Sequence, residues 1–421
     1  MHKRKAQSFM KNTYTDLMAL FSSAAAGGSC SVSGNINLGE IYALANEAGV
    51  WTYVFSSLKM LYNNGKISIE KDTFDTLNKT VILKTVKASK RKMTVHKILG
   101  ALEKEGINAL ILKGESLSHL YNQSNLRISS DTDILIDEKD EEKALGIIES
   151  FGAEIHKKSS VSHHTRCTCD ETGLIEVHTD VYEDYIDDLY FKKHHISKEN
   201  PISVKTDDGF LLKTLSVNDG LYFLTFHLIK HYVSMGCGLR QVMDLLLYMK
   251  YYKDEIDFEK YEKTLEDLNF DGLIKSIIGV GIEYFHLDKN DFYTADYDKK
   301  TVEKLACDII ESGAFGKCEE ERKAFNDEFL KIKLKKGYLS HKISFAAEFF
   351  AKSASFKYSN IISKYQYVKK HKILLPIAYI HHILYIIAAV IKRPFMKKAK
   401  KDDSFINNRL SLFEQMKIIK R

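Results

Sequence analysis

Two short strand-like stretches carry polar side chains at the spacing i, i+2. Asp131 and Asp133 open an apolar run, and Glu176 and His178 alternate with apolar residues further along the chain. Side chains at i and i+2 lie on one face of a strand, about 7 Å apart. Carboxylates that converge there repel each other, by roughly 4 kcal/mol for two charges about 4 Å apart at an effective dielectric of about 20. A divalent cation removes this repulsion, and oxygen ligands favour Mg²⁺ or Mn²⁺ over zinc.

The alternative is that these aspartates are merely solvated at the end of a strand, because D-x-D alone is a weak signal. A glycine turn before the pair and a Glu-x-His strand after it favour the metal site. Glu176 is alternatively an exposed hairpin residue, and His178 is equally well explained as a structural histidine. We expect Asp131, Asp133 and Glu176 to be metal ligands and catalytic residues.

A tight turn precedes the two aspartates. The apolar run at residues 107–113 ends at Gly114, and residues 115–121 have apolar side chains at helical spacing. Glycine permits a sharp turn and close approach of the backbone to a ligand. The N-terminus of a helix presents free N–H groups and a partial positive charge, which suits a phosphate.

These residues carry a resemblance to a known family. The pattern L-K-G-x(2)-L-x(2)-L-Y at residues 112–121 is followed by Arg127, S-D-T-D-I-L-I at residues 130–136 and I-E-V-H at residues 175–178. This combination resembles the uncharacterised bacterial nucleotidyltransferases within the DNA polymerase beta superfamily, to which the kanamycin-type enzymes are distantly related. The resemblance is strongest over residues 107–182 and extends more weakly into the flanking helical segments.

The resemblance implies roles for the turn and for the acidic residues. Gly114 matches the glycine turn beside the triphosphate, Asp131 and Asp133 match the metal-binding D-x-D, and Glu176 matches the third carboxylate. The superfamily commonly has Gly-Ser at the turn, whereas a glutamate follows Gly114 here.

The phosphate contact is therefore expected from Lys113, Ser116 or Arg127, since arginine is suited to bidentate contact with phosphate. The alternative is that Lys113 and Arg127 only pair with the acidic cluster.

Two further pairs have i, i+4 helical spacing. His227 and His231 are spaced as zinc ligands can be, but no third ligand is evident. The resemblance instead implies that they line the cleft, with His178 and His231 on the nucleotide side. Arg240 and Asp244 are expected to form an ion pair on the surface of a helix.

Composition sets the broad class of protein. The chain has 421 residues, 44% of them hydrophobic, and a net charge of +6. This charge is mild for the length and shows no strongly basic track, so we expect no nucleic-acid partner. The six cysteines have no second pair at zinc spacing, and no signal peptide is readable, so we expect reduced thiols and a cytoplasmic location.

The expected fold class is α+β, and the resemblance specifies it as a small mixed-sheet, polymerase beta-like nucleotidyltransferase core within a mostly helical chain. Strands are expected at residues 107–113, 131–136, 153–157, 162–169 and 174–182, with a helix at 139–151. We divide the chain into an N-terminal helical region (residues 1–105), the core (106–201), a helical region closing the cleft (202–290) and a C-terminal helical region (291–421).

Residues 373–391 form an uncharged, mostly apolar segment flanked by basic residues. A buried helix is the first explanation, a peripheral contact of residues 373–398 with anionic lipid the second, and a transmembrane span the third, since about 20 apolar residues span a bilayer. Pro376 and a pair of histidines argue against the span.

The predicted function is a metal-dependent nucleotidyltransferase that moves an NMP group from an NTP, with ATP favoured, to a hydroxyl of a small molecule, sugar or protein. Asp131 or Glu176 is expected to accept the proton of that hydroxyl. The alternative, supported by the altered turn, is a catalytically silent nucleotide-binding or scaffold protein, with or without membrane-surface association.

Overall fold

The computed structural model describes residues 2–33, 36–156, 164–170, 173–182, 191, 194, 196–234, 236–313, 367, 374, 376–378, 380, 381 and 403–419. The chain divides into two compact units, residues 1–319 with 412–418 and residues 320–411 with 419–421. The three predicted regions before residue 290 all lie in the first unit. Their boundaries remain predictions.

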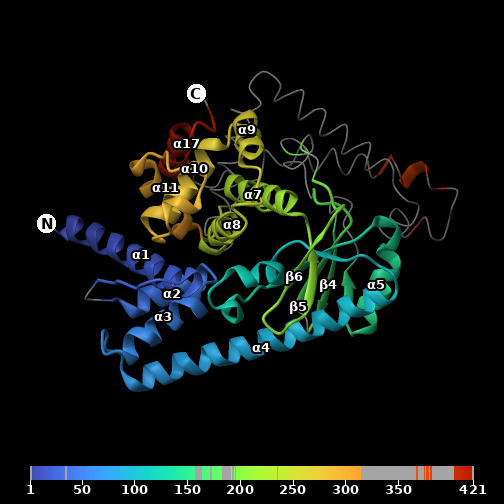
Figure 1. The fold of residues 1–421 in the computed structure, drawn as a ribbon, viewed down its shortest axis with the longest axis horizontal. Helices are drawn as coiled ribbons and strands as arrows, with labels where there is room; N and C mark the ends of the chain where they lie inside the picture. The colour runs from blue at the N-terminus through green and yellow to red at the C-terminus, as the bar shows by residue number, and fades with distance from the viewer. Residues whose placement is uncertain are drawn as a thin grey trace. The chain divides into compact units, whose positions relative to one another are not determined.

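Four helices precede the sheet: α1 (His2–Ala26), α2 (Leu38–Glu47), α3 (Trp51–Asn63) and α4 (Lys71–Lys104). Gly49 has a φ of +67° and separates α2 from α3, because this conformation carries no steric cost for glycine. Helix α1 packs against α3. The long helix α4 begins beside α3 and runs without interruption to the sheet (Figure 1).

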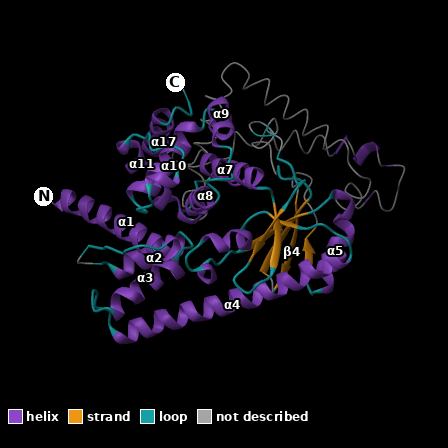
Figure 2. Ribbon diagram, in the orientation of Figure 1, coloured by secondary structure: helices purple, strands orange, loops and turns teal. Residues whose placement is uncertain are grey.

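The main sheet has five strands in the order β1-β2-β5-β4-β3. The strands are β1 (Leu110–Ile111), β2 (Asp131–Leu135), β3 (Glu154–His156), β4 (His164–Cys169) and β5 (Gly173–His178). Strands β2 and β5 are parallel, and the other neighbours are antiparallel. This mixed sheet within a largely helical chain (Figure 2) confirms the predicted α+β class.

A second, two-stranded sheet was not predicted from the sequence. Strands β6 (Ile202–Lys205) and β7 (Leu211–Thr214) form an antiparallel hairpin, where a helical region had been expected to begin. The Thr214 hydroxyl donates to the carbonyl oxygen of Ile111 at 2.7 Å, which ties the hairpin to β1.

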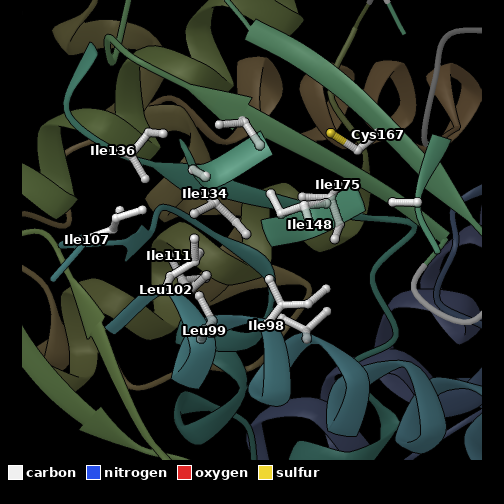
Figure 3. Close-up of a cluster of buried hydrophobic side chains, with 14 of the residues drawn as sticks. Ile98, Leu99, Leu102, Ile107, Ile111, Ile134, Ile136, Ile148, Cys167 and Ile175 are labelled. Atoms are coloured by element: carbon white, nitrogen blue, oxygen red, sulfur yellow. The ribbon is translucent and has the colours of Figure 1, made fainter. Parts of the chain in front are cut away.

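One face of the main sheet is covered by α4 and by α5 (Glu141–Ser150), the latter close to its predicted range. Ile98, Leu99 and Leu102 lie on one stripe of α4 and point at the strands (Figure 3). Ile134 of β2 and Ile175 of β5 meet them from the sheet. The apolar side chains of both central strands therefore lie on this face.

After β7, the described residues of the first unit continue in α7 (Val217–Ser234), α8 (Leu239–Tyr251), α9 (Phe258–Leu268), α10 (Asp271–Glu283) and α11 (Lys299–Ser312). Helix α17 (Asp403–Gln415) begins in the second unit and ends in the first. Short 3₁₀ helices are η1 (Gly114–Leu120), η2 (Ser124–Leu126), η3 (Glu138–Asp140) and η4 (Lys289–Asp291).

Within the part of the chain that the structure describes, no helix has both the length and the apolar character that crossing a membrane requires. Most of residues 373–398 lie outside the described residues. The membrane-contact alternatives for this segment therefore remain predictions.

Candidate active site

The predicted carboxylates lie on the sheet face that α4 and α5 do not cover. Ile134 and Ile175 point into the core, and side chains alternate along a strand. Asp131, Asp133 and Glu176 therefore point to the opposite side. In the parallel ladder Asp133 stands directly beside Glu176. Two strands thus bring together two carboxylates that are 43 positions apart in the sequence.

Asp133, Glu176 and His178 form a compact cluster. One potential ligand atom from each lies within 4.8 Å of the others, and the side chains are buried, with 1%, 9% and 0% of their residue surfaces exposed. His178 Nε2 lies 3.3 Å from Asp133 Oδ1. His178 therefore lies within reach of the Asp133 carboxylate and of the Glu176 carboxylate.

Asp131 is not part of this cluster and has different partners. The hydroxyls of Ser129 and Ser130 donate to Asp131 Oδ1 at 3.1 and 3.2 Å, and Lys113 Nζ lies 3.6 Å from Oδ2. Burial acts to raise the pKa of Asp131, but Lys113 and the Ser129 hydroxyl outweigh it and lower the pKa to about 2. The Asp131 side chain is therefore an anion at any physiological pH.

Lys113 connects the two aspartates. Its Nζ lies 3.4 Å from Asp133 Oδ1 as well as 3.6 Å from Asp131 Oδ2, and 3.3 Å from Nε2 of His227 on α7. Burial, and then the charge of Lys113, hold the pKa of His227 well below its usual value. His227 is therefore neutral and accepts from the lysine, while the lysine offsets the negative charge of the aspartates.

The chemistry of this cluster fits a divalent cation. Oδ2 of Asp133 is buried and has no hydrogen-bond partner among the described residues. A buried carboxylate oxygen normally has a partner, because the unsatisfied atom costs free energy. Glu176 and His178 add an oxygen and a nitrogen ligand within reach. Lys113 supplies charge but leaves this oxygen unsatisfied.

The predicted glycine turn is present. Gly114 has a φ of +77°, and η1 begins at this residue. A Cβ atom there would meet Ser129 Oγ at 3.6 Å and the Asp131 carbonyl oxygen at 3.7 Å, so the turn packs on the segment that leads into β2. Ser116 is buried, and its hydroxyl has no hydrogen-bond partner among the described residues.

Glu115 stands where the superfamily commonly has serine, and its carboxylate points at α4. Its carboxylate oxygen Oε1 lies 2.6 Å from His96 Nε2 and 3.4 Å from Lys92 Nζ. Asp208 lies near the same histidine, at 3.6 Å, and also contacts Lys92. His96, Glu115 and Asp208 meet the geometric criterion for a metal group, but Lys92 already supplies a cation there. This cluster is an ion-pair network that fixes Glu115.

Arg127 was expected to contact phosphate or to pair with the acidic cluster, and in the structure its partner is Asp244. Its guanidinium makes a bidentate contact with Asp244 of α8, Nε to Oδ1 at 2.9 Å and Nη2 to Oδ2 at 2.7 Å, and also donates to the Gly114 carbonyl oxygen. Tyr121 donates to the same aspartate at 2.6 Å. The expected surface pair between Arg240 and Asp244 was wrong, because Asp244 is buried and Arg240 donates instead to the Ile128 carbonyl oxygen.

The remaining predicted residue, His231, lies one turn after His227 on α7, with its ring 4.4 Å from that of His227. It therefore contacts His227, which in turn contacts Lys113.

Glu176 also has neighbours from β4: Arg166 donates to it at 3.0 Å, and His164 lies at 3.6 Å. Arg166 was not singled out for this site from the sequence, and only the cross-strand register could have placed it there.

A comparison with protein families decides the classification. A family described as an uncharacterised nucleotidyltransferase matches residues 34–280, more than half of the chain. The chain belongs to this family. The matched segment contains the glycine turn, all three carboxylates and helices α7 and α8. No curated protein and no solved structure matches the chain. The predicted resemblance to an uncharacterised nucleotidyltransferase family is thereby confirmed.

Proposed function

We propose that this member of the nucleotidyltransferase family is an active, metal-dependent enzyme that transfers an NMP group from an NTP to a hydroxyl. The observation that carries the proposal is the Asp133–Glu176 pair, buried in register at the centre of the sheet, with one carboxylate oxygen of Asp133 unsatisfied. A silent scaffold has no need to keep two carboxylates buried side by side, since their repulsion destabilises the fold.

Asp131, Asp133 and Glu176 would hold the metal, Mg²⁺ or Mn²⁺, with His178 orienting Asp133 or serving as a further ligand. A histidine in the set favours Mn²⁺ more than an all-oxygen set would. When bound, such a cation supplies charge neutralisation on the triphosphate and a lowered pKa for the acceptor hydroxyl.

The glycine turn would bind the triphosphate. Lys113 is the cation that contacts both aspartates, and Ser116 offers a buried hydroxyl without a partner among the described residues. Arg127 is assigned a positioning role, because its guanidinium holds the Gly114 carbonyl oxygen and the Asp244 carboxylate. His231 would act through His227, which accepts from Lys113.

The reaction forms a bond between the acceptor oxygen and the α-phosphorus and breaks the bond from that phosphorus to the bridging oxygen of the leaving pyrophosphate. The acceptor's proton goes to Asp131 or Glu176. Most of the rate enhancement would come from positioning and charge neutralisation, as in other phosphoryl transfers.

The donor is an NTP, and ATP is the first to test. The altered turn does not argue against activity, since the Glu115 carboxylate is bound by His96 and Lys92 and adds no free charge beside the triphosphate. The acceptor is a hydroxyl compound, and the next subsection narrows its class.

Titration with Mn²⁺, followed by the paramagnetic signal of the free ion, tests the metal site. The wild type should bind the ion, and Asp133→Asn should weaken binding at least about tenfold, because it removes one charged ligand. Asp137→Asn is the matched control: it also removes a carboxylate just after β2, but Asp137 pairs with Lys198 on the surface. Equal binding by Asp133→Asn and wild type would contradict the proposal, as would nucleotide transfer retained by Asp133→Ala.

A further inference from the structure

A cavity of about 750 Å³ lies beside the segment that leads into β2. Five parts of the chain line it: the α2–α3 turn, one side of α4, residues 128–130, the turn between β4 and β5, and the start of α8. No single stretch of the chain contains this cavity, so it is not evident from the sequence. It lies wholly within the first compact unit.

The charged lining of this cavity is predominantly cationic. Four basic side chains line it, Lys84, Lys87, Arg91 and Arg240, against the two acidic side chains Glu47 and Asp170. Cations that gather in a concave surface attract anions, and arginine and lysine are the side chains that bind phosphate and carboxylate. Lys87 projects from an exposed position on α4, so its charge is available to a ligand.

A second observation at this cavity comes from Trp51. The residue lines the cavity and is 2% exposed, and its indole N–H has no hydrogen-bond partner among the described residues. A buried indole N–H usually donates to a partner, so a residue of the cavity wall keeps an unused hydrogen-bond donor. An anionic group of a ligand is the kind of acceptor that this donor lacks.

The cavity is separate from the carboxylates yet joined to them. None of Asp131, Asp133, Glu176, Lys113 or Gly114 lines it. Its wall includes Ser129 and Ser130, and the same two hydroxyls donate to Asp131 Oδ1.

A ligand in the cavity is therefore not held by the residues assigned to the donor triphosphate. It is nevertheless anchored directly beside a residue assigned to catalysis.

We propose that this cavity binds an anionic group, a phosphate or a carboxylate, of the acceptor substrate. The inference rests on the proposed nucleotidyltransferase function and specifies its acceptor as a hydroxyl compound that carries a negative charge remote from the reacting oxygen. Arg91 is in addition a positioning residue: it donates to the carbonyl oxygens of Ser129 and Ser130 and to that of Leu174, and so ties the cavity wall to both central strands.

Trp51 makes the test site-specific, because it is the single tryptophan of the chain. Its fluorescence is titrated with inorganic phosphate and separately with succinate, at fixed low ionic strength, since surface charges are screened by salt. The wild type should show a saturable change with at least one of the two probes.

The deciding variant is Lys84→Glu/Lys87→Glu, which reverses two exposed charges of the cavity. It should raise the apparent dissociation constant at least about tenfold. Lys90→Glu is the control, because it makes the same change at an exposed position of α4 outside the cavity lining. Circular dichroism checks that both variants fold.

A parallel titration with Mg²⁺ and NTP separates the acceptor from the donor. If the double variant weakens NTP binding by the same factor as phosphate binding, the cavity holds the donor triphosphate and the acceptor assignment is overturned. If neither probe binds the wild type, or if Lys90→Glu has the same effect as the double variant, there is no anion site. If the wild type binds phosphate but no NTP, the anion site stands and the nucleotidyltransferase proposal fails.

Discussion

Removing the charge of Asp244 should destabilise the fold far more than removing an exposed ion pair. Asp244 accepts two hydrogen bonds from Arg127, at 2.9 and 2.7 Å, and a third from Tyr121 at 2.6 Å. The side chains of Arg127 and Asp244 are only 3% and 9% exposed. Burial alone acts to lower the pKa of Arg127, but Asp244 more than offsets it and raises the pKa above its usual value. The arginine is therefore a buried cation that depends on this carboxylate.

The size of the effect follows from this burial. Asp244→Asn keeps an oxygen for Tyr121 but leaves the Arg127 charge uncompensated, and breaking a buried pair in this way costs about 3–5 kcal/mol. Since domains are stable by only about 5–15 kcal/mol, this is a large fraction of the total. Lys143→Met is the comparison: Lys143 pairs with Glu105, but the two side chains are 52% and 55% exposed, so the loss should be much smaller than that of Asp244→Asn.

Urea denaturation followed by Trp51 fluorescence measures these changes. The double variant Arg127→Met/Asp244→Asn no longer has an uncompensated buried charge. Its loss of unfolding free energy should be smaller than the summed losses of the two single variants, by at least about 1 kcal/mol. The reasoning is refuted if Asp244→Asn costs less than about 1 kcal/mol, or if the effects of the two single substitutions simply add.

Three further predictions concern the turn and the histidine beside it. Gly114→Ala should cost about 1–2 kcal/mol in urea denaturation, because a φ of +77° strains any residue with a Cβ, and wild-type stability would contradict this. Glu115→Gln should leave the affinity for Mg²⁺ and NTP unchanged in calorimetry, since its carboxylate faces Lys92; tighter binding would show that this charge reaches the triphosphate. The free energy of unfolding should fall as the pH drops below about 6.5, because His227 stays neutral in the fold while the unfolded chain takes up a proton. His227→Gln should reduce that slope, and an unchanged slope would place the proton uptake elsewhere.

The sequence contained most of what positions the carboxylates. Period-two alternation placed Asp131 and Asp133 on one face of their strand, and Glu176 on one face of a second strand. The structure adds that these strands, β2 and β5, are parallel neighbours with Asp133 beside Glu176. The positive φ of Gly114 also agrees with the expected turn. These features are local, so spacing and residue type were enough to predict them.

Long-range partners were not predictable in the same way. Arg127 and Asp244 are separated by 117 positions, so nothing nearby in the sequence shows that the pair is buried and that it excludes Arg240. The compatible i, i+4 spacing of Arg240 and Asp244 was a reasonable local signal, but burial of the aspartate on the inner side of α8 overrode it.

The β6–β7 hairpin and the cationic cavity were missed for a related reason. The hairpin is short, and its apolar members Val204 and Leu212 join the core only through contacts with distant segments. The cavity is lined by residues from five separate segments, so a count of basic residues along the chain does not reveal its positive charge.

Calorimetric titration with ATP, CTP, GTP and UTP, each with and without Mg²⁺, tests the central claim most directly. The account predicts that the wild type binds at least one NTP in a metal-dependent manner, and that the Asp131→Ala/Asp133→Ala variant loses this binding while remaining folded. If the well-folded wild type binds none of the nucleotides, even with Mn²⁺ in place of Mg²⁺, the carboxylates do not form a nucleotidyltransferase site and the silent-scaffold alternative holds.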